Sequence, residues 1–160
     1  MSLFLLDWTK CLFGSTNTFS GSWGSLDCTT STSNGCHTVS YSGKDCLRLD
    51  NHYSNNTYDV NFGCDVKDVS FDLFDISLSK CGDNKLCDVI FKNALGHVVE
   101  AKYEWINNCV RVTCAEPIQS IKVCYEPSFL NYCDLKIGPV NCAPVPTEDG
   151  VVEGTAGDDL

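Results

Sequence analysis

Apolar and polar residues alternate at a period of two through most of residues 66–105, and this pattern constrains the fold more than any other feature of the sequence. A period of two gives a β-strand one side that packs in a core and one side that faces water. We predict three successive strands in this stretch. In the first strand the apolar parity changes between Leu73 and Phe74, which predicts a β-bulge at that point. The third strand is expected to turn four side chains inward, namely those of Val99, Ala101, Tyr103 and Trp105.

Similar short runs recur along the rest of the chain roughly every 10 to 15 residues, with no stretch of helical period. They amount to about eight strands, so the predicted fold class is all-β, an antiparallel β-sandwich. Residues 13–41 are rich in Ser, Thr, Gly and Asn and are predicted to form either a long surface loop or a pair of short edge strands. We place the sandwich domain at residues 1–138. Residues 139–160 contain three prolines and an acidic tail, which is typical of a linker.

The bulk composition narrows the classes of partner. The chain has 160 residues, a formal net charge of −10 and a pI near 4.5. Nucleic acids and anionic membranes are bound through basic patches, so neither is an expected partner. No window of the sequence is apolar over the roughly 20 residues that a membrane-spanning helix needs, so membrane insertion is not expected.

The chain contains twelve cysteines, and no two of them form a Cys-x-x-Cys pair. Zinc ribbons, iron–sulfur clusters and haem attachment need closely spaced ligands, so the spacing argues against these classes. We expect a disulfide-rich protein in an oxidising compartment, extracellular or at the cell surface. The alternative is that many cysteines are small buried apolar residues. Five residues separate Cys81 from Cys87, which suits a local disulfide, and this is the one pair that we predict.

Two segments resemble known jelly-roll domains. Residues 69–76 read Val-Ser-Phe-Asp-Leu-Phe-Asp-Ile and are followed by a Gly/Asp loop, a strand and Asn-Ala-Leu-Gly. This order resembles the middle of jelly-roll sandwich domains in large secreted or surface proteins of bacteria. Residues 118–125, with residues 135–137, look like the penultimate and final strands of those domains. The resemblance covers residues 47–139 and implies a jelly-roll-like sandwich.

The end of the chain, residues 149–160, resembles the entry to an RTX calcium-binding array, whose nonapeptide repeat is Gly-Gly-x-Gly-x-Asp-x-U-x with U a large aliphatic residue. Gly154, Gly157 and Asp159 match the first glycine, the last glycine and the aspartate, while Thr155 stands in place of the second glycine. The resemblance implies that these residues bind Ca²⁺ and that the chain is the leading domain of a longer exported protein.

Further candidate binding residues follow from the sequence itself. Phe19 and Trp23 lie in the Gly/Ser-rich segment, where they either stack on sugar rings or anchor the segment to the sandwich. Asp75 follows the predicted bulge, where its carboxylate and freed backbone oxygens suit a structural Ca²⁺. The three histidines lie in different parts of the chain and have no local partner, so we predict no catalytic residue.

These observations lead to one functional expectation and two alternatives. We expect a non-catalytic β-sandwich module of an extracellular, calcium-dependent secreted or surface protein. Its role is adhesion or carbohydrate binding, with glycans or other extracellular proteins as partners. The alternative is a disulfide-stabilised structural subunit that self-assembles into an extracellular assembly or filament. A fragment of a glycan-active enzyme is the third hypothesis.

Overall fold

The computed structural model describes residues 4–6, 16–21, 24–33, 35–41, 43–49, 56–74, 87–107, 109–125 and 135–145, and for residues 4–6, 16–21, 24–27, 87 and 144 it describes the backbone alone. Every regular element in these ranges is a β-strand, and every strand pairing is antiparallel. The described residues thus include no helix that is long and apolar enough to cross a membrane. The all-β, antiparallel prediction is confirmed. The strands are β1 (Phe4–Leu6), β2 (Thr16–Gly21), β3 (Gly24–Thr32), β4 (Cys36–Tyr41), β5 (Lys44–Leu49), β6 (Asn56–Phe74), β7 (Cys87–Lys92), β8 (Val98–Val99), β9 (Lys102–Ile106), β10 (Cys109–Cys114), β11 (Ile118–Tyr125), β12 (Lys136–Ile137) and β13 (Val140–Pro144).

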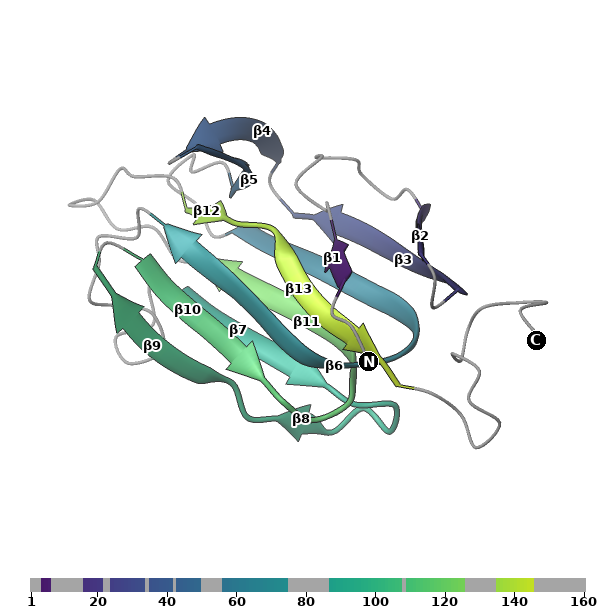
Figure 1. Ribbon diagram of the computed structural model, residues 1–160. Helices are drawn as coiled ribbons and strands as arrows, with labels where there is room; N and C mark the ends of the chain where they lie inside the picture. The colour runs from purple at the N-terminus through teal and green to yellow at the C-terminus, as the bar shows by residue number, and fades with distance from the viewer. Residues whose placement is uncertain are drawn as a thin grey trace.

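Strand β6 organises the fold because its two halves belong to two different layers (Figure 1). Its first half pairs with β3 on one side and β11 on the other. We call this the back layer, after its place in Figure 1, and it extends through β2, β7 and β8. The second half of β6 pairs with β10 on one side and with β12 and β13 on the other. This front layer extends through β9, β1, β5 and β4.

The chain passes from the back layer to the front layer at Asp68. Inward-facing residues of β6 are even-numbered up to Val66 and odd-numbered from Val69 to Leu73. Asp68 lies between these runs with a φ of 51°, in the left-handed region that Asp tolerates better than most residues. One such residue bends the strand and exchanges its two sides. Pairing with β10 is regular from Val69 through Phe74, so the bulge predicted between Leu73 and Phe74 is wrong. The buried residues change from even to odd numbers earlier in the strand, at Asp68.

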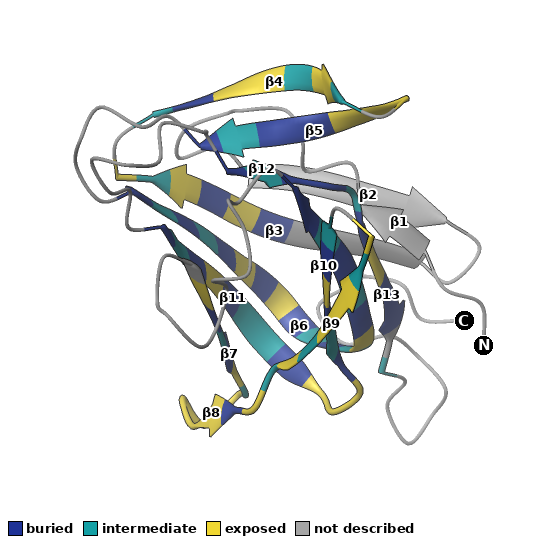
Figure 2. Ribbon diagram, turned by 90° about the vertical axis from the view of Figure 1, so that its left-hand side faces the viewer, coloured by how far each residue is buried: buried dark blue, intermediate teal, exposed yellow. Residues whose placement is uncertain are grey.

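The core fills the space between the two layers, which Figure 2 shows from the side with buried residues in dark blue. Phe71 of the front layer meets Phe91 of β7 edge to face, with ring centroids 6.4 Å apart. Tyr103 of β9 also reaches the back layer, where its hydroxyl oxygen accepts a hydrogen bond from the backbone N–H of Val89 at 3.1 Å. Away from the crossing of β6, this hydrogen bond therefore connects the edge strand β9 of the front layer to β7 of the back layer.

The three runs predicted within residues 66–105 form strands, but the first run does not pair with either of the other two. β7 pairs with β11 and β8, whereas the second half of β6 pairs with β10. The third run divides into β8, at the edge of the back layer, and β9, at the edge of the front layer. Val99 is buried, and Ala101 and Tyr103 pack partly against the core. Trp105 is 47% exposed on the edge strand β9, so the prediction that it packs inward is wrong.

The β-sheet structure also continues beyond residue 138. Strand β13 pairs with β6 and β1 and buries Val140, Cys142 and Ala143. The predicted domain boundary at residue 138 is therefore too early. Pro139 precedes this strand and Pro144 ends it, positions at which a proline is compatible with a sheet.

The Ser/Thr-rich segment forms strands where the structure describes it. β2 and β3 form one hairpin, and β4 and β5 form another. β3 is not an edge strand, because it pairs with both β2 and β6.

Candidate binding groove

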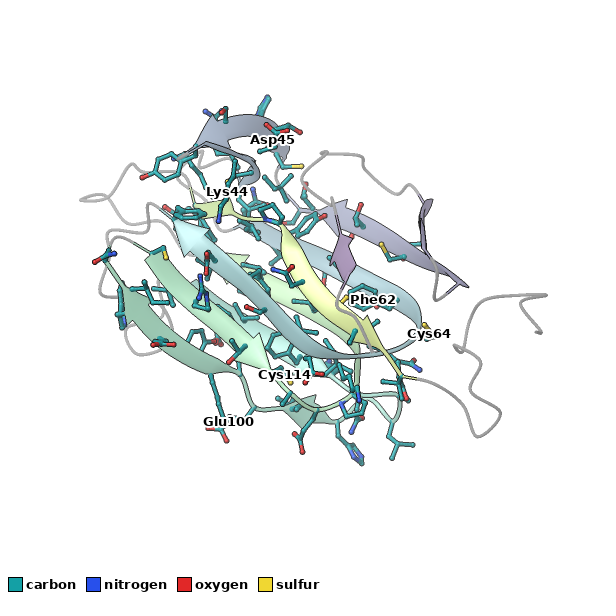
Figure 3. The ribbon with its side chains drawn as sticks, viewed as in Figure 1. Lys44, Asp45, Phe62, Cys64, Glu100 and Cys114 are labelled. Atoms are coloured by element: carbon teal, nitrogen blue, oxygen red, sulfur yellow. The ribbon has the colours of Figure 1, made fainter. Side chains whose placement is uncertain are left out.

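A groove of about 420 Å³ lies on the outer face of the front layer, beside the β4–β5 hairpin. The strand register builds its polar lining. Asp72 of β6 lies opposite Arg111 of β10, and Ser70 of β6 lies opposite Asn141 of β13. Lys44 joins them from the hairpin, and Figure 3 shows it beside the end of β6. An adjoining hollow of about 500 Å³ shares three lining residues with this groove.

Asp72 and Arg111 form a two-point ion pair in the groove. Nε of Arg111 donates to Oδ1 of Asp72 at 2.9 Å, and Nη2 donates to Oδ2 at 3.3 Å. The Asp72 side chain is 13% exposed and the Arg111 side chain is 44% exposed. The hydrogen bond to Asp72, together with its negative charge, raises the pKa of Arg111. Two parallel hydrogen bonds fix the plane of the guanidinium, so its remaining donors keep one orientation at the groove.

Two aromatic rings lie where the groove meets the adjoining hollow: Phe74 lines both, and Tyr41 lines the hollow. Tyr41 packs on Phe74 with ring centroids 5.3 Å apart, and Nζ of Lys136 lies 4.9 Å from the centroid of the Tyr41 ring. Gly138 lies close to the ring of Phe74. Its N–H donates to the backbone oxygen of Asp72 at 2.8 Å. A Cβ atom at residue 138 would lie 3.3 Å from Cε2 of Phe74. A larger residue there would displace the ring on which Tyr41 packs.

A second, acidic surface lies where β6 crosses between the layers. Two hollows of about 480 and 560 Å³ share Glu100 and Glu116, with Asp65 lining the first and Asp68 the second. Figure 3 shows Glu100 projecting away from the body of the sandwich. Among the residues that the structure describes, no group of three or more His, Cys, Asp or Glu side chains is arranged to hold a metal ion. We call the surface lined by Asp65, Asp68, Glu100 and Glu116 the acidic surface.

Most of the residues that the sequence singled out lie outside the described part of the chain. For Phe19 and Cys87 the backbone alone is described: Phe19 lies opposite Leu26 in the β2–β3 hairpin, and Cys87 begins β7 opposite Tyr125. The sugar-stacking, calcium and Cys81–Cys87 disulfide hypotheses therefore stay predictions. The residues outside the described ranges are Trp23, Asp75, Cys81, Gly154, Gly157 and Asp159.

The described cysteines give a mixed result. Cys36 is disulfide-bonded. Cys46, Cys109, Cys114 and Cys142 are thiols, as the alternative of small packed cysteines expects. Burial is the largest cause of a raised pKa in each of these four. A thiol with a raised pKa is a poor nucleophile, so none of the four is activated for covalent catalysis.

Sequence reasoning missed this groove, although it identified the strands that carry Asp72 and Arg111; strand β13, which contributes Asn141, fell in the predicted linker. The alternation in β6 and β10 places Asp72 and Arg111 on the wet faces of their strands. That signal does not say which strands are neighbours, and the pairing of residues 72 and 111 is a contact between distant parts of the sequence. The contact between Tyr41 and Phe74 depends likewise on how the β4–β5 hairpin packs against β6.

Comparison with known proteins adds no assignment, since no protein-family model, no curated protein and no solved structure matched the chain. The class is therefore defined by the fold and the groove alone. It is an all-β antiparallel protein with a polar and aromatic groove on the outer face of one layer.

Proposed function

We propose that the chain is a non-catalytic extracellular module that binds carbohydrate through the groove of the front layer. The observation that carries this proposal is the placement of the Tyr41–Phe74 ring pair beside the fixed Asp72–Arg111 ion pair. A sugar ring offers a face of C–H groups that stacks on an aromatic ring. It also carries hydroxyl groups on adjacent carbons, which both donate and accept hydrogen bonds. The ion pair supplies acceptors and donors in one plane, which suits such neighbouring hydroxyls.

The size of the groove and its other polar groups fit the same ligand class. Its volume of about 420 Å³ falls within the range of small-molecule sites. Lys44 and Asn141 line it with further donors and an amide acceptor. Polar groups that converge beside an apolar surface are the usual composition of a site that fixes the orientation of a ligand.

The carboxyl groups of the groove favour binding over glycan hydrolysis. Hydrolysis by the usual mechanisms needs two carboxyl side chains about 5–9.5 Å apart. Among the described lining residues of the groove and its adjoining hollow, Asp72 is the one carboxylate, and Arg111 engages both of its oxygens. A carboxylate held in this way serves as a hydrogen-bond acceptor.

The wider context belongs to the same proposal. The cysteine content supports an extracellular or cell-surface location. The resemblance of residues 149–160 to an RTX array supports a calcium-dependent secreted protein in which this module precedes the repeats. Adhesion to glycans on another surface is the role that we assign to such a module.

A glycan array probed with the full chain, followed by calorimetric titration of the strongest ligand, tests the proposal. Tyr41→Ala removes the stacking surface and Arg111→Ala removes the fixed donors. Each loss is expected to weaken binding about tenfold or more, the equivalent of about 1.4 kcal/mol. Arg111→Lys keeps the charge without the planar fork and is expected to restore little of the affinity.

The matched control is Leu95→Ala, because Leu95 is an exposed apolar residue that lines the acidic surface instead of the groove. It is expected to leave glycan affinity unchanged. Binding to no glycan, or binding that survives both groove variants, contradicts the proposal. Binding that Trp23→Ala abolishes while Tyr41→Ala leaves it intact places the ligand on the Gly/Ser-rich segment instead.

A structural subunit is the second candidate, and exposed apolar side chains favour it. Leu95, Val98 and Trp105 are the large hydrophobic residues exposed among those described. Trp105 lies on β9, whose described partner is β10 alone, and edge strands with apolar side chains promote association. Sedimentation over a range of protein concentrations separates the two candidates. Assembly that Trp105→Lys abolishes supports the structural role, whereas a monomer that binds glycan supports the first proposal.

A further inference from the structure

The guanidinium of Arg111 has two pairs of parallel N–H donors, and Asp72 occupies one of them. Nε and Nη2 donate to the two oxygens of Asp72, in the side-on arrangement of an arginine–carboxylate pair. The outer N–H groups of Nη1 and Nη2 form the second pair, which lies in the same plane. Among the described residues no acceptor engages this outer pair. The Arg111 side chain lines the groove and is 44% exposed, so we expect a ligand in the groove to reach these donors.

Strand register places a second cation on the same face as Arg111. Lys136 of β12 lies opposite Phe74 of β6, and Arg111 of β10 lies opposite Asp72, two residues earlier in β6. Residues two apart in a strand face the same side, so both cations lie on the outer face of the front layer. The β4–β5 hairpin adds Lys44, which lines both the groove and the adjoining hollow.

The charge of the groove is opposite in sign to that of the chain. Among the described lining residues of the groove and the hollow, the cations are Lys44 and Arg111 and the anion is Asp72, which leaves one positive charge in excess. Nζ of Lys136 lies beside the hollow, 4.9 Å from the centroid of the Tyr41 ring. The whole chain carries a formal net charge of −10. A local excess of positive charge on an acidic protein favours an anionic ligand at that place.

We propose that the groove is specific for acidic sugars and that the sugar carboxylate binds the outer N–H pair of Arg111. This inference rests on the proposed function and names the class of sugar. A carboxylate is planar and accepts two parallel hydrogen bonds, so it matches the outer pair as Asp72 matches the inner one. Lys44 supplies a second positive charge to the same ligand group. A neutral sugar offers hydroxyl groups there, and charge-assisted hydrogen bonds are roughly twice as strong as neutral ones.

Calorimetric titration of the full chain with two matched pairs of sugars tests the proposal. One pair is sialyllactose and lactose. The other is a disaccharide that ends in glucuronate and its carboxyl-reduced form, which ends in glucose. In at least one pair the acidic sugar is expected to bind about tenfold more tightly than the neutral one, and that pair identifies the sugar acid. A rise in ionic strength is expected to narrow the difference, because salt screens exposed charges.

Three variants assign the preference to particular charges. Arg111→Lys keeps a positive charge without the planar fork and is expected to lose most of the preference for the acidic sugar. Lys44→Gln is expected to weaken binding of the acidic sugar by about threefold. Glu104→Gln is expected to strengthen it by about twofold, because Glu104 lies opposite Arg111 on β9 and repels an anionic ligand. The matched control is Lys122→Gln, which removes one exposed positive charge from β11 in the back layer and is expected to leave the preference unchanged.

The outcomes separate this inference from the proposed function. Equal affinity for the acidic and neutral sugars of both pairs, lost in Tyr41→Ala, overturns the acidic-sugar assignment and leaves carbohydrate binding in place. A preference that survives Arg111→Lys overturns the role given to the planar fork. A stronger response to sulfated than to carboxylated glycans on the array overturns the choice of a carboxylate. Binding to neither pair overturns the inference, and silence across the whole array contradicts the proposed function as well.

Discussion

Replacing Tyr103 with Phe removes one hydroxyl group that connects the two layers away from β6. The hydroxyl oxygen accepts the N–H of Val89 at 3.1 Å, and its own proton has two acceptors at 3.4 Å, Oδ1 of Asp88 and the backbone oxygen of Val89. Val89 is buried, and among the described residues β8 pairs with residues 91 and 92 of β7 but not with Val89. In Tyr103→Phe the N–H of Val89 is therefore left without this acceptor.

The expected cost follows from that loss. A buried donor that loses its partner costs about 1–3 kcal/mol, and the net worth of one hydrogen bond is about 1 kcal/mol, so we expect a loss of about 1–2 kcal/mol in the free energy of unfolding. For a domain of this size that corresponds to a fall in Tm of about 2–8 °C. Urea denaturation followed by circular dichroism measures it, with an unchanged slope against urea showing that the unfolding transition itself is the same.

Trp105→Phe is the matched control, because Trp105 lies two residues away on the same strand and is exposed. It is expected to change the free energy of unfolding by less than about 0.5 kcal/mol. A Tyr103→Phe protein as stable as this control refutes the reasoning, since it would mean that the hydroxyl group does not hold β9 to β7. Asp88→Ala is expected to have a small effect, because the backbone oxygen of Val89 remains as the second acceptor.

Three further outcomes are expected. Asp68→Gly should be neutral or stabilising by up to about 1 kcal/mol, whereas Asp68→Val should destabilise by about 1–2 kcal/mol or more, because only the first suits a φ of 51°; equal urea midpoints contradict this. Phe91→Ala should cost about 3–5 kcal/mol and Leu95→Ala less than about 0.5 kcal/mol by the same assay, since one side chain is in the core and the other is exposed. Burial raises the pKa of Cys114, Cys142 and Tyr58, so their neutral forms are favoured in the folded state. The stability of the reduced protein should be intact below the unfolded thiol pKa of about 8.5 and fall above it, by up to about 1.4 kcal/mol per pH unit for each thiol; an equal fall in Cys142→Ala speaks against this cause.

The alternation of apolar residues was enough to predict the strands, because burial of one strand side depends on local sequence alone. Prediction failed where a local signal was absent. The crossing at Asp68 has no glycine or proline to mark it. The apolar pattern predicts a bulge instead at Leu73–Phe74, where two adjacent side chains are buried at the end of β6. Pro139 gave a misleading signal, since the strand that follows it belongs to the core.

Strand order was the second limit, and it governs the groove. The sequence of β6 and β10 shows which side chains face outward, but the Asp72–Arg111 pair exists because these two strands are neighbours in the front layer. The same holds for the cysteines. Their spacing along the chain favoured the local pair Cys81 and Cys87, whereas the register of β3 with β6 places Cys28 and Cys64 on the same side of the back layer from strands far apart in the sequence.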